Sequence, residues 1–328
     1  MNTLFLHVGP HKTGTTSIQK FLLDNRQALE KANVIYPERF QRIFGHHPFR
    51  ELLDTKAISQ DDLKFFNNTE KDFLLSSEDL ISLGKDKFEY LRSTLESKKI
   101  VVIYAWRRAS FKLYSIWQET IKHGSTEPFF SYYHNHLARP AQSQMLSPDL
   151  KLAMFINVFG RDNVKVLDYD ASSKSDSLLQ DFLQICNVEW QDSFITPEDN
   201  PDAVNRSMDF TDIEVIRALN HLFRDQTSVE GSWVRTRYSK HRSALNNSGL
   251  DRLKELIAGN SQELKVGNYF IDNRSEKIML DKYKDNILNY QPCTSVRSLK
   301  LAGSEWIFDL EAQAILQDLA QVMKDAVN

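Results

Sequence analysis

The first 33 residues change their pattern twice, and this change constrains the fold more than any other feature of the chain. Residues 3–8 are a short apolar segment, residues 9–16 are rich in glycine and threonine, and apolar residues then recur at helical spacing over residues 16–33. The apolar face of this predicted helix contains Ile18, Phe21, Leu22 and Leu29. A buried strand that enters a tight turn and then a helix is the first unit of an α/β fold.

Later segments predict further strands and helices of the same kind. Residues 100–106 are the clearest strand, because a near-continuous apolar run is typical of strands buried in a parallel sheet. Further strands are expected at 72–76 and 163–169, and helices at 87–96, 110–122, 150–159, 177–186, 209–223, 249–258 and 304–325. Residues 34–70 and 124–147 are expected to be irregular.

These elements predict an α/β fold with a parallel sheet that is flanked by helices, like the sheet of phosphate-binding-loop proteins. We expect the core of this fold, with its phosphate-binding turn, over residues 1–200. A mainly helical region over residues 201–328 is expected to pack on that core as part of one structural domain.

The composition is that of a soluble globular protein and argues against several kinds of partner. The chain has 328 residues, 41% hydrophobic and 26% charged, with a formal net charge of −3. No global basic field is present to attract nucleic acid, so we expect no nucleic-acid partner. Cys186 and Cys293 have no metal-site spacing, and so few cysteines fit a reducing compartment. No apolar run reaches the roughly 18 residues of a membrane span and no signal-peptide pattern is visible, so we expect a cytoplasmic protein.

The turn at residues 9–16 has the chemistry of a site for phosphate or sulfate. Backbone N–H groups at the N-terminus of a helix have no partner within the helix, and the helix dipole adds partial positive charge there. Gly9 and Gly14 let an anion approach the backbone closely, and Lys12 adds a full positive charge. Hydroxyl groups are supplied by Thr13, Thr15, Thr16 and Ser17.

The position of the lysine separates this turn from the loop of ATP-binding enzymes. That loop reads G-x-x-x-x-G-K-[ST], and Gly9 and Gly14 have its glycine spacing. Thr15 stands where the loop needs lysine, and Lys12 precedes the second glycine. This order argues against an ATP–Mg²⁺ site. An ATP-dependent phosphotransferase and a nucleotide-binding protein without catalysis nevertheless remain alternatives.

The segment Pro10-His11-Lys12-Thr13-Gly14-Thr15-Thr16 resembles the 5′-phosphosulfate loop of sulfotransferases that use 3′-phosphoadenosine 5′-phosphosulfate (PAPS). The inserted His11 resembles the form of the loop in bacterial members of that family. The resemblance implies transfer of a sulfuryl group from PAPS to an acceptor hydroxyl, on a carbohydrate or glycan, with adenosine 3′,5′-bisphosphate as product. It implies no requirement for a metal ion.

A second motif resembles the family's site for the 3′-phosphate of the donor. The family has an arginine after a strand and a serine eight positions later, and Arg107 and Ser115 have this spacing after the predicted strand 100–106. A guanidinium group can grip a phosphate with two hydrogen bonds. Arg108 is a competing candidate. The resemblance covers about residues 1–190, and the glycine-rich adenosine motif of the cytosolic phenol and steroid enzymes is not visible.

The resemblance also suggests catalytic roles. Lys12 would stabilise the charge that grows on the leaving phosphate, and a general base would take the proton of the acceptor hydroxyl. Glu78 is the first candidate for that base, because it follows the strand 72–76 and should lie at the carboxyl edge of the sheet. His11 is the second candidate. His46 and His47 also remain open.

Overall fold

The computed structural model describes residues 2–196, 208–224, 231–266, 270–292 and 297–325. The chain forms two compact units that interleave along the sequence. The first unit comprises Met1–Ala109, Ala141–Asn205 and Phe270–Cys293, and the second comprises Ser110–Pro140, Arg206–Tyr269 and Thr294–Asn328. The sequence suggested a single boundary near residue 200, whereas each of these units takes three segments of the chain.

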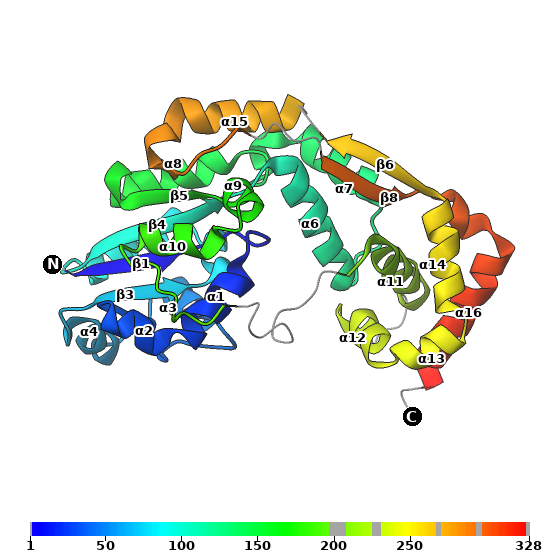
Figure 1. Cartoon of the computed structure of the whole chain (residues 1–328), viewed down its shortest axis with the longest axis horizontal. Helices are drawn as coiled ribbons and strands as arrows, with labels where there is room; N and C mark the ends of the chain where they lie inside the picture. The colour runs from blue at the N-terminus through cyan, green and yellow to red at the C-terminus, as the bar shows by residue number, and fades with distance from the viewer. Residues whose placement is uncertain (1, 197–207, 225–230, 267–269, 293–296, 326–328) are drawn as a thin grey trace. The chain divides into compact units, whose positions relative to one another are not determined.

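The first unit is built on a parallel sheet, as the sequence predicts (Figure 1). The six strands of this sheet among the described residues follow in the order β2 (Val34–Ile35), β3 (Asp72–Ser76), β1 (Thr3–His7), β4 (Lys99–Trp106), β5 (Val164–Asp168) and β7 (Ile287–Leu288). Every pair of neighbours is parallel. Because the chain continues to β3 on one side of β1 and to β4 on the other, the strand order reverses at β1. Ligands of open α/β sheets bind at the carboxyl ends of the strands at such a point.

Helices cover both faces of this sheet. Successive side chains of a strand point to opposite faces, so an apolar strand makes both faces apolar and both must be covered. Leu4 and Leu6 of β1 belong to one apolar cluster and Phe5 to the other. The cluster with Phe5 includes residues of α1 (Thr15–Asp24), α2 (Arg26–Lys31) and α10 (Leu178–Ile185). The cluster with Leu4 includes residues of α3 (His47–Asp54), α4 (Gln60–Asn67), α5 (Lys85–Thr94), α8 (Pro148–Phe159) and α15 (Phe270–Tyr283).

The second unit is mainly helical. Its helices are α6 (Ala109–Lys122), α7 (Phe129–Ala138), α11 (Phe210–Phe223), α12 (Trp233–Lys240), α13 (Arg242–Asn247), α14 (Leu250–Gly259) and α16 (Leu310–Asp325). An antiparallel pair, β6 (Ser261–Val266) and β8 (Arg297–Ala302), accompanies them. Ile216, Leu253 and Leu319 are among the fully buried residues of its core. Across the described residues, no helix has the length and apolar character needed to cross a membrane.

Several elements differ from the sequence expectations. The segments expected to be irregular contain α3, α4 and α7. In α7, Phe129, Tyr132, Tyr133 and Leu137 recur at helical spacing, and Phe129 packs into the core of the second unit. The strands β2, β6, β7 and β8 were not predicted, although the alternation of buried Leu299 and Leu301 with exposed Lys300 is a strand signal. Cys186 is buried, and Cys293 lies outside the described residues.

Candidate functional site

The carboxyl ends of neighbouring strands bring most of the predicted site residues to one edge of the sheet. His7, the last residue of β1, is in register with Ser76, the last residue of β3. The chain passes from β1 into the loop at residues 8–14, from β3 toward Glu78, and from β4 to Arg107. The predicted place of Glu78 at the carboxyl edge of the sheet is therefore confirmed, while its role stays a prediction.

The backbone of the loop at residues 8–14 is anchored to the neighbouring strand. The Val8 N–H donates to the carbonyl of Ile103 at 3.1 Å, and the Ala105 N–H donates to the carbonyl of Gly9 at 2.7 Å. These bonds extend the β1–β4 pairing past the end of β1. The loop therefore begins from a rigid base, which is what a site that must hold an anion in a fixed orientation requires.

Two positions in the loop need glycine. Gly9 and Gly14 have φ values of 77° and 74°, in the left-handed region that favours glycine. A Cβ atom on Gly9 would lie 2.8 Å from the Cβ of Glu78, and one on Gly14 would lie 2.7 Å from a methyl carbon of Leu178 and 3.1 Å from the ring of Tyr169. Glu78, Leu178 and Tyr169 therefore approach the loop as closely as they do because both positions lack a side chain.

Helix α1 presents its N-terminus to the end of the loop. Gly14 is the N-cap residue, and among the described residues no side chain caps this helix. The first hydrogen bond of the helix runs from the Ile18 N–H to the Gly14 carbonyl at 3.0 Å. The N–H groups of Thr15, Thr16 and Ser17 come before it and lack an acceptor within the helix. This is the geometry in which helix N-termini bind phosphate and sulfate.

The Thr13 hydroxyl, which the sequence suggests as a donor to an anion, forms a hydrogen bond within the loop. It donates to the carbonyl of Pro10 at 2.5 Å, and the residue is fully buried. The hydroxyl thus stabilises the bend of the loop, so any contact from Thr13 to an anion would come from its backbone N–H. Lys12, the preceding residue, is only partly buried and has a left-handed φ of 64°.

Arg107 lies directly against the loop. Its Nη1 donates to the carbonyl of Lys12 at 2.8 Å, and its guanidinium carbon is 5.2 Å from the ring centroid of Tyr169. Its Nε is 3.9 Å from Oδ1 of Asp170. The aromatic ring and the carboxylate restrict the guanidinium from two sides, which lowers the entropy cost of binding a phosphate.

Arg108, the competing candidate, is a structural residue. Its side chain is 4% exposed, and its guanidinium lies 3.3 Å from Oδ2 of Asp170 and 3.0 Å from Oε1 of Glu276. Asp168 is also near, with Oδ1 3.6 Å from Nη1 of Arg108. Burial raises the pKa of Asp168 to about 6, although the positive charge of Arg108 opposes the rise. These ion pairs join the ends of β4 and β5 to α15. Arg108 therefore uses its guanidinium to stabilise the fold.

Ser115, the predicted partner of Arg107, belongs to the second unit. It lies on α6 and is partly buried. Its pairing with Arg107 around a phosphate stays a prediction.

Glu78 is held by a residue that the sequence did not single out. Nε2 of Gln19, on α1, donates to Oε2 of Glu78 at 2.7 Å. The other carboxylate oxygen, Oε1, is 4.0 Å from Nδ1 of His11, and the Glu78 side chain is 14% exposed. The carboxylate is thus tied to α1 through one oxygen and faces the loop histidine with the other.

His46 and His7 are sealed inside the fold. The Ser76 N–H donates to Nδ1 of His46 at 3.1 Å, and Nε2 of His46 lies 2.9 Å from the Pro37 carbonyl, to which it donates. Nδ1 of His7 lies 2.8 Å from Oγ of Ser76. Both rings are completely buried. His46 uses both ring nitrogens within the fold, so we do not propose it as the base.

These two histidines predict that acid destabilises the protein. Burial lowers the pKa of His7 to about 3 and that of His46 to about 4, whereas an unfolded histidine has a pKa of about 6.5. The unfolded state therefore binds more protons below about pH 6.5, so the free energy of unfolding should fall as the pH falls, by roughly 1 kcal/mol per pH unit for each residue. Urea unfolding at pH 7.5, 6 and 5 measures this slope. His7→Asn and His46→Asn should each make it shallower, whereas the exposed His123→Gln should not, and equal slopes in all variants would contradict the assignment.

His47 and His11 line a cavity beside the loop. The cavity has a volume of about 330 Å³ and is lined by His11, Arg42, His47, Arg50, Glu51, Asp79 and Ser82. Nδ1 of His47 lies 2.8 Å from Oδ2 of Asp79, and Nε2 of His11 lies 3.8 Å from Oδ1 of the same residue. The hydrogen bond to Asp79 raises the pKa of His47 above its ordinary value. The structure thus brings two predicted histidines together around a carboxylate that the sequence analysis did not select.

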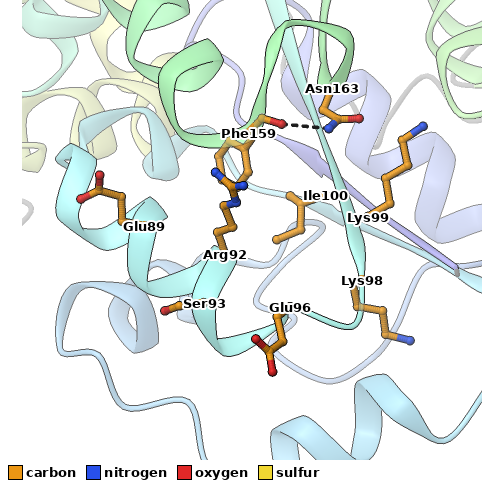
Figure 2. A pocket seen from close by; sticks show the side chains of 9 residues that line it. All are labelled: Glu89, Arg92, Ser93, Glu96, Lys98, Lys99, Ile100, Phe159 and Asn163. Carbon is orange, nitrogen blue, oxygen red and sulfur yellow. Dashed lines mark hydrogen bonds between the residues drawn. The ribbon is translucent and has the colours of Figure 1, made fainter.

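A larger cavity lies at the opposite edge of the sheet, where β4 begins. Figure 2 shows the side chains that line its volume of about 660 Å³. Lys98 and Lys99 stand at the amino end of β4, and Nδ2 of Asn163 donates to the carbonyl of Phe159 at 2.8 Å. Because ligands of open α/β sheets bind at the carboxyl edge, this cavity is not part of the candidate site.

No protein-family model matches the chain, and no match was found among curated proteins. Among solved structures, the chain is similar to the crystal structure of a sulfotransferase from Alicyclobacillus acidocaldarius, with 17% identity over 67% of this chain and 96% of the other. The TM-score is 0.37.

Proposed function

We propose that this chain transfers a sulfuryl group from PAPS to the hydroxyl group of an acceptor, with a carbohydrate or glycan as the acceptor class. The observation that carries the proposal is the loop at residues 9–14, which ends at an uncapped helix N-terminus with Lys12 beside it and Arg107 bonded to its backbone. A donor with phosphate groups at both the 5′ and 3′ positions needs two sites for anions, and these residues offer both.

The first of these sites would hold the 5′-phosphosulfate group. Backbone N–H groups from Thr13 to Ser17 surround the N-terminus of α1, and the hydroxyl of the exposed Thr16 adds a donor. Lys12 would lie beside the oxygen that joins phosphate to sulfate. Its ammonium group would stabilise the negative charge that develops on the phosphate as the S–O bond to that oxygen breaks.

The second site would hold the 3′-phosphate. Arg107 presents a guanidinium group whose orientation is restrained by Tyr169 and Asp170. A guanidinium can donate two parallel hydrogen bonds to a phosphate. Ser115 is the proposed second ligand of this phosphate.

Ligand binding tests this proposal against an ATP-dependent enzyme. Adenosine 3′,5′-bisphosphate, without metal, should raise the midpoint of thermal unfolding of the full chain, because a ligand that binds the folded state stabilises it by mass action. ATP with Mg²⁺ and ADP serve as the comparison ligands. A shift with ATP–Mg²⁺ and none with the bisphosphate would overturn the proposal.

Arg107→Ala should weaken binding of the bisphosphate by about 10- to 100-fold, because a hydrogen-bonded charge contributes roughly 1.5–3 kcal/mol. Arg107→Lys keeps the charge but loses the paired donors, so its affinity for the bisphosphate should lie between those of the wild type and Arg107→Ala. Isothermal titration with adenosine 3′,5′-bisphosphate gives the three constants. The same titration with adenosine 5′-monophosphate is the control, since a ligand without the 3′-phosphate should respond much less to either substitution. Equal losses for both nucleotides would contradict the assigned role.

A further inference from the structure

The cavity of about 330 Å³ beside the loop is not used by the proposed donor site. His11 is the residue of the loop that lines it, next to Lys12 in the chain. The cavity therefore adjoins the loop in which Lys12 would bind the donor. Its remaining walls come from α3, from the segment before α3, and from the 3₁₀ helix η1 (Glu78–Ser82).

A histidine–aspartate pair forms part of this wall. Nδ1 of His47 and Oδ2 of Asp79 are 2.8 Å apart, and Oγ of Ser77 is 3.4 Å from the same ring nitrogen. A carboxylate only accepts hydrogen bonds, so Nδ1 carries the hydrogen that bonds to Asp79. In the neutral ring the lone pair then belongs to Nε2. A carboxylate that fixes the tautomer and the orientation of an imidazole in this way makes Nε2 the basic atom.

The other candidate bases are less well arranged for the same task. Nε2 of His11 lies 3.8 Å from Oδ1 of Asp79, too far for a hydrogen bond that would fix its tautomer. Glu78 has one carboxylate oxygen bonded to Gln19, and its Cβ lies so close to Gly9 that a Cβ atom there would be only 2.8 Å away. His46 has both ring nitrogens bonded within the fold. His47, in contrast, lines the cavity and has one ring nitrogen committed to Asp79.

We propose that this cavity binds the acceptor, and that His47, oriented by Asp79, takes the proton from the acceptor hydroxyl. The inference rests on the proposed sulfuryl transfer. In the step, the acceptor oxygen forms a bond to sulfur while the bond from sulfur to the bridging oxygen of the donor breaks. The bridging oxygen keeps the electron pair and leaves as part of the 5′-phosphate, and the hydroxyl proton passes to Nε2 of His47. Asp79 is a positioning residue, whose negative charge stabilises the imidazolium that results.

The lining of the cavity fits a sugar as the acceptor. Guanidinium, imidazole, carboxylate and hydroxyl groups surround it, from Arg42, Arg50, His11, Asp79 and Ser82. Such a set can donate to and accept from several hydroxyl groups of one ligand at once. The volume is at the lower end of the range for small-molecule sites, which corresponds to one sugar unit of a larger acceptor.

The charges around His47 set the pH at which it can act. Glu78 and Asp79 of η1 act on His47, as does Arg42 from the segment before α3. The other charged or titratable residues that line the cavity are His11, Arg50 and Glu51. The hydrogen bond to Asp79 raises the pKa of His47, and the charge of Arg42 lowers it. Only the neutral ring accepts a proton, so turnover should fall as the pH decreases through the pKa of His47. Asp79→Asn should lower this pKa, and the acid limb of the rate profile should therefore move to lower pH.

The experiment measures release of adenosine 3′,5′-bisphosphate from PAPS by the full chain, with chitotetraose as the acceptor probe and with water alone. At saturating PAPS, His47→Gln should turn over about 100-fold more slowly than the wild type, in line with the 10²–10⁴-fold typical of general bases. Asp79→Asn should lose less and show the shifted acid limb. His123→Gln is the matched control, because His123 is also paired with a carboxylate, Glu119, at 3.3 Å, on the exposed surface of α6 and the turn after it.

Binding of adenosine 3′,5′-bisphosphate distinguishes a failure of the proposed function from a failure of the role of His47. If the wild type does not bind adenosine 3′,5′-bisphosphate, the proposed function is wrong. If the variants bind it like the wild type and His47→Gln turns over at the wild-type rate, the function stands and the role of His47 is wrong. An unmoved acid limb in Asp79→Asn, or a wild type that binds the donor and never releases the bisphosphate, also overturns the assignment of the pair.

Discussion

Lys12→Met is expected to reduce sulfuryl transfer by about 10³-fold while it weakens bisphosphate binding much less. The methionine keeps most of the length of the side chain and removes its charge. In the proposed reaction that charge matters most when the bond between sulfur and the bridging oxygen is breaking, because negative charge then develops on the phosphate. Loss of one preorganised group that stabilises such charge costs about 10²–10³ in turnover. Rates at saturating PAPS, together with titration of the bisphosphate, measure the two effects separately.

Lys64→Met is the control for this variant. Lys64 is a lysine on α4 whose side chain is 78% exposed and pairs with Asp61 at 3.1 Å, so its loss should leave both quantities unchanged. The assigned role of Lys12 fails if Lys12→Met keeps turnover within a few-fold of the wild type. It also fails if bisphosphate affinity falls while turnover at saturating PAPS is unchanged, since Lys12 would then contribute only to binding.

Gly9→Ala is expected to lower the free energy of unfolding by about 3 kcal/mol and to abolish binding of the bisphosphate. A left-handed φ costs a residue with a Cβ atom roughly 1–2 kcal/mol, and overpacking costs another 1–3 kcal/mol. The new Cβ would lie 2.8 Å from the Cβ and 3.1 Å from the Cα of Glu78, and a backbone atom cannot move aside as the end of a side chain can. Relief of this contact would displace the loop from β3 and β4. Urea unfolding and a titration with the bisphosphate check both outcomes.

Gly259→Ala is the matched control. Gly259 is the last residue of α14, and a Cβ atom there would meet nothing within 4 Å. Alanine is the better helix former, so this variant should be as stable as the wild type or up to about 1 kcal/mol more stable. If Gly9→Ala were equally harmless, the close approach of the loop to Glu78 would not be needed for folding or for binding.

A large part of the fold follows from local sequence patterns. The apolar runs at 3–8, 72–76, 100–106 and 163–169 predict buried parallel strands, and the structure confirms all four. The helices between them have apolar residues at helical spacing, which is a property of the segment itself. In contrast, β7 is a strand of two residues that pairs with β5 from more than 100 positions away in the chain. A pairing of that kind depends on tertiary contacts that a local pattern does not contain.

The loop at residues 9–16 was readable from the sequence, because its chemistry depends on adjacent residues. Glycines that permit left-handed backbone, a lysine between them and a helix start immediately after them are all specified by their order. The placement of Glu78 and Arg107 at the same edge also followed, since parallel strands that are neighbours in a sheet end at the same edge. The sequence by itself therefore determined the backbone conformation of the loop and the set of residues that gather at this edge of the sheet.

Only the tertiary structure decided which of those residues are buried in the fold and which line the candidate site. Arg107 and Arg108 are adjacent in sequence, yet one contacts the loop and the other is buried among carboxylates. His46 and His47 are adjacent too, yet the first is sealed between Ser76 and Pro37 and the second lines a cavity. Neighbouring side chains on a strand end or a helix start point in different directions. Burial and hydrogen-bond partners, which come from distant segments, then decide which of the two can meet a ligand.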